Sequence, residues 1–153
     1  MKPFAYSVER VFEHPAARLW DAWTDAAQLQ WWYHPTVLDC VPGSATSEAR
    51  VGGRWAIAVD VPDNGFVAYF YGIYSVVEPY KRLEHSLYYT QSHDEWLAAD
   101  LGMPSHDIVI EFEPRTDGTW VKFSQFGELP AEQVEATQDG MESYFDSLET
   151  FLG

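Results

Sequence analysis

The sequence predicts an α+β fold in which an antiparallel sheet receives one face of a long C-terminal helix. Residues 130–152 carry apolar side chains mostly three or four positions apart, which is the spacing of one helix face. Strand-like stretches separated by tight turns precede this segment, and the other helical patterns lie near the start of the chain. Consecutive strands joined by tight turns indicate an antiparallel meander.

The C-terminal helix is predicted to be amphipathic. Its apolar face consists of Val134, Met141, Tyr144, Phe145, Leu148, Phe151 and Leu152. An opposite face, which we expect to point at water, consists of Glu132, Glu135, Asp139, Glu142, Asp146 and Glu149. Pro130 suits the first turn, where its missing N–H costs nothing. Gly140 in mid-helix costs about 1 kcal/mol relative to Ala, and we expect it to admit a close neighbour, the sheet in preference to a ligand.

Length and cysteine content bound the class of protein. The 153 residues are predicted to form one domain, 1–153, that needs neither disulfide nor metal to fold. Cys40 is the only cysteine, which favours a cytoplasmic location. We find neither the apolar core of a signal peptide nor a run long enough to span a bilayer.

The chain is acidic and rich in aromatic residues. Nine basic residues against 24 acidic ones give a formal charge of −15, which would repel nucleic acid and anionic membranes, so neither is an expected partner. Aromatic residues make up 16% of the chain, with seven Trp and nine Tyr. These two side chains combine an apolar body with a polar tip, which suits the wall of a ligand cavity as well as a core.

The elements are predicted in order along the chain. A strand over residues 4–12 leads into a helix over residues 16–23, and a second helix begins after Asp25 as its cap and ends before Pro35. Further strands are expected at residues 54–61, 66–77, 82–91, 107–113 and 119–126. Asp63-Asn64-Gly65 and Thr116-Asp117-Gly118 favour turns between neighbouring strands.

An ordered set of short motifs resembles the SRPBCC (START-like) superfamily. The motifs are Trp23-Thr24-Asp25 with Leu29 and Trp31-Trp32, Gly52-Gly53-Arg54-Trp55, Gly72 with Val77-Glu78-Pro79 and Arg82-Leu83, and Gly118-Thr119. The set covers nearly the whole chain and is similar, more narrowly, to the branch of the heat-shock chaperone ATPase-activator homologues. It does not specify an activity, because this superfamily contains binding proteins, cyclases, oxygenase domains and chaperone regulators.

The resemblance implies a helix-grip fold, a curved antiparallel sheet wrapped around the C-terminal helix, with two short helices after the first strand and a cavity between sheet and helix. Two features depart from the family. Relatives often carry Gly-Trp in the last helix, where this chain has Gly140-Met141. Residues 92–105, which include His93, Asp94, Glu95 and Trp96, exceed a plain hairpin, and we expect a lid over one cavity mouth.

Alternation along the strands predicts which side chains face the cavity, although a one-residue bulge reverses the assignment. Tyr69, Tyr71, His85, Tyr89 and Gln125 are expected to be polar tips in an apolar cavity. The complete predicted ligand-binding set is Trp32, Tyr33, His34, Trp55, Tyr69, Tyr71, His85, Tyr89, Phe112, Phe123, Gln125, Met141 and Phe145.

Few residues suggest catalysis. His85 is the candidate for proton transfer because histidine titrates near neutral pH, and a core histidine satisfied by a tyrosine hydroxyl is the alternative. No metal-binding motif is present, and His93 and His106 would have to meet in space to form a metal site, so we expect neither metal nor cofactor. Cys40 has no nearby base in sequence and is expected to be buried and inert.

Three functions remain open. The favoured one is binding of a hydrophobic or aromatic small molecule in the cavity. The alternatives are a cyclase- or hydrolase-type enzyme that uses His85 and one tyrosine, and a chaperone-associated interaction module whose acidic helix face meets a basic partner. Association into a homodimer through sheet edges or helices is also left open.

Overall fold

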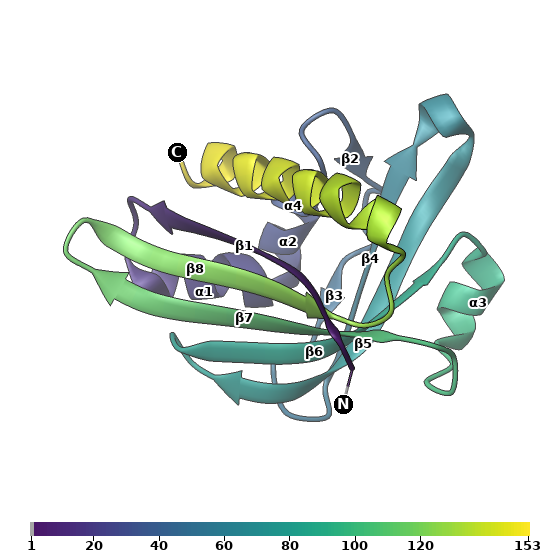
Figure 1. Ribbon diagram of the computed structural model, residues 1–153, viewed down its shortest axis with the longest axis horizontal. Helices are drawn as coiled ribbons and strands as arrows, with labels where there is room; N and C mark the ends of the chain where they lie inside the picture. Colours follow the sequence, from purple (N-terminus) through teal and green to yellow (C-terminus); the bar gives the residue numbers. More distant parts are fainter. Residues whose placement is uncertain (1) are drawn as a thin grey trace.

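The computed structural model describes residues 2–153 and confirms the α+β class (Figure 1). The chain begins with β1 (Phe4–Phe12), α1 (Ala16–Thr24) and α2 (Ala26–Trp32). The middle consists of β2 (Asp39–Cys40), β3 (Thr46–Ser47), β4 (Arg54–Val61), the 3-10 turn η1 (Pro62–Asn64), β5 (Phe66–Glu78) and β6 (Arg82–Thr90). The chain ends with α3 (His93–Ala98), β7 (His106–Arg115), β8 (Gly118–Phe126) and α4 (Ala131–Leu152).

The strands form one antiparallel sheet in the order β1-β8-β7-β6-β5-β4-β2, and β3 also pairs with β4. The sheet curves around α4, while α1 packs against β7 and β8, and α2 packs against α4 (Figure 1). β1 is the first strand in sequence but pairs with β8, so the first and last strands lie side by side. This arrangement is the helix-grip fold that the resemblance implies.

Local chemistry explains several element boundaries. The Asp25 carboxylate accepts a hydrogen bond from the Ala27 N–H at 3.2 Å, which caps α2 as predicted. Gly65 closes the hairpin between β4 and β5 with a φ of 74°, a conformation that favours glycine. At Gly72, a Cβ atom would overlap the Ser86 carbonyl oxygen, which accepts a hydrogen bond from the Trp55 indole at 3.1 Å.

The apolar face of α4 closes the core near β1 and α1. Phe145 is fully buried and its ring lies 5.6 Å from that of Phe12 and 6.3 Å from that of Trp23. Leu148 is also fully buried and Leu152 is nearly so. The predicted apolar face therefore packs as expected over the C-terminal half of the helix.

The acidic face of α4 is not left wholly to solvent, which corrects the sequence-based expectation. Arg10 of β1 forms ion pairs with Glu142 at 2.9 Å, Asp146 at 2.9 Å and Glu149 at 3.0 Å. These acids lie three or four residues apart and share one side of the helix. A single guanidinium thus connects the first strand to two turns of the last helix.

The predicted inward orientation of Tyr69 and Tyr71 is wrong. In the β4–β5 pairing, inward-facing Trp55 and Ile57 lie opposite Gly72 and Phe70, so the even-numbered residues of this part of β5 face inward. The two tyrosines face outward, where α3 covers them: the rings of Tyr69 and Trp96 are 5.0 Å apart. Because α3 gives the outer face an apolar cover, both faces of β5 are aromatic and alternation alone does not separate them.

Candidate functional site

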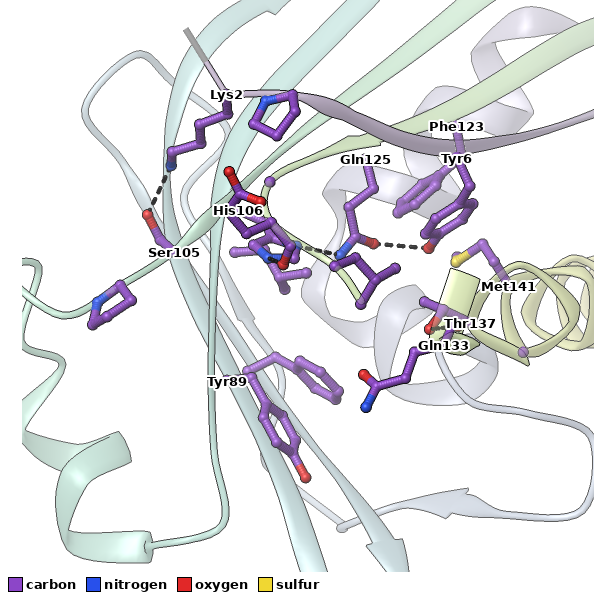
Figure 2. Close-up of a pocket in the computed structure, with 18 of the residues that line it drawn as sticks. Lys2, Tyr6, Tyr89, Ser105, His106, Phe123, Gln125, Gln133, Thr137 and Met141 are labelled. Carbon is purple, nitrogen blue, oxygen red and sulfur yellow. Dashed lines mark hydrogen bonds between the residues drawn. The ribbon is translucent and has the colours of Figure 1, made fainter. Parts of the chain in front are cut away.

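A cavity of about 1170 Å³ lies between the N-terminal half of α4 and the sheet (Figure 2). Its walls come from the start of β1, the end of α2, strands β5, β6 and β8, and the segments on either side of β7 and β8. The residues that line it include Lys2, Tyr6, Tyr33, Phe70, Leu87, Tyr89, Met103, Ser105, His106, Phe123, Gln125, Glu128, Leu129, Gln133, Thr137, Gly140, Met141 and Tyr144.

Five residues of α4 form the helix side of the cavity, with spacings of four, three, one and three: Gln133, Thr137, Gly140, Met141 and Tyr144. Nothing lies within 4 Å of the position that a Cβ atom of Gly140 would occupy. The expectation that the sheet approaches closely at Gly140 is therefore wrong, and the glycine instead leaves room in the cavity.

A chain of hydrogen bonds crosses one end of the cavity. The Tyr6 hydroxyl donates to Gln125 Oε1 at 2.8 Å, and Gln125 Nε2 donates to His106 Nδ1 at 2.7 Å. His106 Nε2 donates to the Glu128 carbonyl at 3.0 Å, which requires its proton on Nε2 because a carbonyl only accepts. Figure 2 shows the Gln125 side chain between Tyr6 and His106, with Tyr89 across the cavity from them.

Two further tyrosines line the cavity with free hydroxyls. The rings of Tyr33 and Tyr144 lie 5.0 Å apart in an edge-to-face arrangement. Neither hydroxyl bonds to another group of residues 2–153, and neither is among the fully enclosed polar atoms without a partner, Trp23 Nε1 and Ser147 Oγ, so both reach the open space of the cavity. Burial raises the pKa of both phenols well above their ordinary value, and each is raised further by other nearby tyrosines. This end of the cavity therefore offers neutral hydrogen-bonding groups in an apolar setting.

Charged side chains are confined to the cavity mouth among the lining residues that the structure describes. Lys2 Nζ lies 3.0 Å from both Ser105 Oγ and Asp107 Oδ1, so its charge is already paired. Glu128 is exposed to solvent and contributes its backbone carbonyl to the hydrogen-bond chain. The deeper walls are apolar or neutral.

Five of the thirteen predicted binding residues line this cavity, and four others are buried in the packed core. Those in the cavity are Tyr33, Tyr89, Phe123, Gln125 and Met141. Trp32 is fully buried with its indole bonded to the Ala22 carbonyl, and Trp55, Phe112 and Phe145 belong to the packed core. His34 lies at the end of α2, where its ring nitrogens contact the carbonyls of Trp31 and Pro35.

His85 faces inward as predicted but does not line the cavity. Its ring packs 4.5 Å from Trp55 and 5.8 Å from Tyr74 between ring centroids, and Nδ1 donates to the Ser86 carbonyl at 2.8 Å. The histidine is thus satisfied by a backbone carbonyl rather than by a tyrosine hydroxyl. Burial lowers its pKa from 6.5 to about 4, which keeps the ring neutral at physiological pH.

The segment that was expected to form a lid over the cavity lies mainly on the outer face of the sheet. Helix α3 packs on the outer face of β5 and β6, where the Trp96 indole donates to the Phe70 carbonyl at 2.9 Å and the Tyr71 hydroxyl donates to the Asp100 carbonyl at 2.8 Å. Only residues 103–105, which follow the helix, reach the cavity rim. The segment therefore frames one side of the mouth.

His93 and His106, which would have to meet to form a metal site, lie apart. His93 stacks with Tyr69 and Trp96 on the outer face, whereas His106 belongs to the hydrogen-bond chain. No group of three or more His, Cys, Asp or Glu side chains within residues 2–153 is arranged to hold a metal ion.

Cys40 is buried, as predicted. Its thiol donates to the Tyr33 carbonyl at 3.2 Å, and burial raises its pKa to about 12, so the reactive thiolate is scarce at neutral pH. Across the same described residues, no helix has both the length and the apolar character needed to cross a membrane.

Sequence reasoning missed several cavity residues, notably Tyr6, His106, Gln133 and Thr137. Tyr6 alternates with Val8, a signal that would have placed both on the inner face of β1. Gln133 and Thr137 continue the helix face of Met141 toward the N-terminus, but their polar side chains hid them from a search for apolar positions.

Comparison with known proteins agrees with the fold. The family model for Activator of Hsp90 ATPase homolog 1-like protein matches residues 13–153. A solved structure from Chromobacterium violaceum is similar at 22% identity, covering 96% of this chain and 95% of its own, with a TM-score of 0.79. One from Staphylococcus epidermidis is similar at 25% identity, with coverages of 99% and 90% and a TM-score of 0.79. No curated protein matches the chain.

Proposed function

The chain belongs to the family of Activator of Hsp90 ATPase homolog 1-like proteins, and from this premise we propose that it binds a hydrophobic or aromatic small molecule between the sheet and α4. The observation that carries the proposal is the cavity of about 1170 Å³. Ligand cavities are concave and mostly apolar, with a few polar groups that orient the ligand. The SRPBCC-like fold of this family is commonly a ligand-binding fold.

The side chains around the cavity support a binding role. Native cores contain few voids larger than a water molecule, yet α4 presents Thr137 and Gly140 to this space instead of large apolar residues. Phe123, Leu87 and Met141 supply apolar contact surface at other points of the wall. Polar groups gather at one end, as expected for a site that orients its occupant.

The two alternative functions gain no specific support. His85, on which the enzymatic alternative depends, lies outside the cavity with its ring packed between aromatic neighbours. The acidic face of α4, on which the interaction alternative depends, already contacts Arg10 through three of its residues.

Native mass spectrometry of protein purified without denaturation tests the proposal. We expect an excess mass that disappears under denaturing conditions, or, for ligand-free protein, saturable binding of the uncharged fluorophore N-phenyl-1-naphthylamine. The matched variant is Gly140→Trp, which places a large side chain in the cavity and should weaken the fluorophore at least tenfold. Equal binding by both proteins would contradict the assignment of the cavity.

A further inference from the structure

The three tyrosines at the polar end of the cavity differ in how their hydroxyls are satisfied. Tyr6 donates its proton to Gln125, whereas the hydroxyls of Tyr33 and Tyr144 bond to no acceptor within residues 2–153 and face the cavity. Tyr33 is only 5% exposed, and its ring is held between Trp55, at 6.0 Å, and Tyr144, at 5.0 Å. Both hydroxyls line the open cavity and are not enclosed by protein atoms, so these two donors are available to an acceptor on a bound molecule.

Among the cavity-lining residues that the structure describes, no cationic side chain lies beside Tyr33 and Tyr144. The cavity's lysine, Lys2, lies at the mouth and is paired with Asp107. The chain as a whole carries a formal charge of −15, which disfavours the approach of anions. A carboxylate at the tyrosine end would lose its water without gaining a counter-charge, which is strongly unfavourable. The same loss of water raises the pKa of Tyr33 and of Tyr144, because burial disfavours the charged phenolate.

We propose that the cavity selects an uncharged ligand whose apolar body carries one hydrogen-bonding head group, such as a hydroxyl or a carboxamide, placed against Tyr33 and Tyr144. This inference rests on the proposed binding function and narrows it to a chemical class. The head group accepts hydrogen bonds from the two free hydroxyls. Because the proton of Tyr6 is committed to Gln125, the Tyr6 oxygen keeps a lone pair for a donor on the same head group. Carboxylates of the same length are excluded.

Ligands matched in length provide the test. Displacement of N-phenyl-1-naphthylamine is measured with decan-1-ol, decanamide and decanoate at about pH 8, where the carboxylate is ionised. We expect the alcohol and the amide each to displace the probe at concentrations at least tenfold lower than decanoate. Tyr33→Phe and Tyr144→Phe remove only the hydroxyls and should each weaken binding of the alcohol about fivefold, the value of one neutral hydrogen bond.

Tyr69→Phe is the matched control, because it removes the same group from the outer face of the sheet, and it should leave every affinity unchanged. Displacement by decanoate as readily as by decan-1-ol would overturn the inference, as would unchanged alcohol affinity in both cavity variants. If the wild-type protein still binds the probe, either of these two results refutes only the proposal that the ligand is uncharged and leaves the proposed binding function intact. Failure of the wild-type protein to bind the probe and all three ligands refutes the binding function and this inference together.

Discussion

The two halves of α4 face the same curved sheet with different results. From Phe145 onward the helix packs against β1 and α1, and Phe145 and Leu148 are fully buried. From Gln133 to Tyr144 the same helix borders a cavity of about 1170 Å³. We call these the closed half and the open half. The helical period is continuous across both, so the difference lies in the side chains that the helix presents.

Side-chain volume and anchoring account for the difference. The closed half presents phenylalanine and leucine to the core, whereas the open half presents Thr137 and Gly140 to the cavity. Arg10 anchors the helix through ion pairs with Glu142, Asp146 and Glu149. Glu142 lies near the end of the open half, and the other two acids lie in the closed half. A well-packed and anchored end thus allows the other end to remain open without loss of the fold.

Removing a large side chain from the closed half should have the greatest effect on stability. Phe145→Ala leaves a void among the rings of Phe12 and Trp23, and we expect the free energy of unfolding to fall by about 3–5 kcal/mol. Thr137→Ala in the open half should change it by about 0.5 kcal/mol or less. Urea denaturation of both variants measures the contrast. Similar losses would show that the two halves are equally packed.

The buried His85 should make the packed part of the structure sensitive to acid. The pKa of His85 is about 4 in the folded protein, compared with its ordinary value of 6.5. As pH falls below 6.5, His85 is therefore protonated in the unfolded chain while it remains neutral in the folded protein. The contribution of neutral His85 to the free energy of unfolding is therefore fully present above about pH 6.5. Between pH 6.5 and pH 4 the free energy of unfolding falls by about 3 kcal/mol because of this residue.

The check for His85 is urea denaturation across this pH range in the wild type and in His85→Gln. The variant should lose about 3 kcal/mol less than the wild type between the two pH limits. Parallel pH profiles would mean that the histidine is not kept neutral by its surroundings.

Filling the open half should weaken binding and spare stability. Gly140→Leu replaces a mid-helix glycine with a good helix former where the added Cβ meets no neighbour, so we expect the free energy of unfolding to rise by up to about 1 kcal/mol. The probe should bind at least severalfold more weakly because the side chain takes up cavity space. Thermal unfolding and probe titration on the same sample measure both. A destabilised protein would show that the position is tightly packed.

Removing the anchor should have a smaller effect. The Arg10 side chain is 21% exposed and its partners are about half exposed, so solvent screening limits the loss in Arg10→Met to about 1 kcal/mol. The loss should shrink as salt is added. Arg50→Met, which removes one exposed pair with Glu48, should have no measurable effect. A salt-independent loss at Arg10 would point to packing on Phe145 instead.

The sequence predicted the elements of the fold better than the contents of the site. Helix α4 and strands β1, β4 and β8 were predictable because each has a clear period and a turn or cap at its end. Tyr69 and Tyr71 were assigned to the wrong face because α3 makes the outer side of β5 apolar as well. His106 and Lys2 reach the cavity from segments far apart in sequence, and no local pattern reports such a meeting.

The pairing of β1 with β8 has a consequence for how the protein is made. Arg10 is separated from its partners on α4 by 132 to 139 positions, and the hydrogen-bonding edge of β1 is completed only by residues 118–126. During synthesis the first strand emerges long before either partner exists. Contacts this distant in sequence form late and slowly. The sheet therefore closes only after β8 has left the ribosome, and until then the apolar face of β1 lacks its native cover.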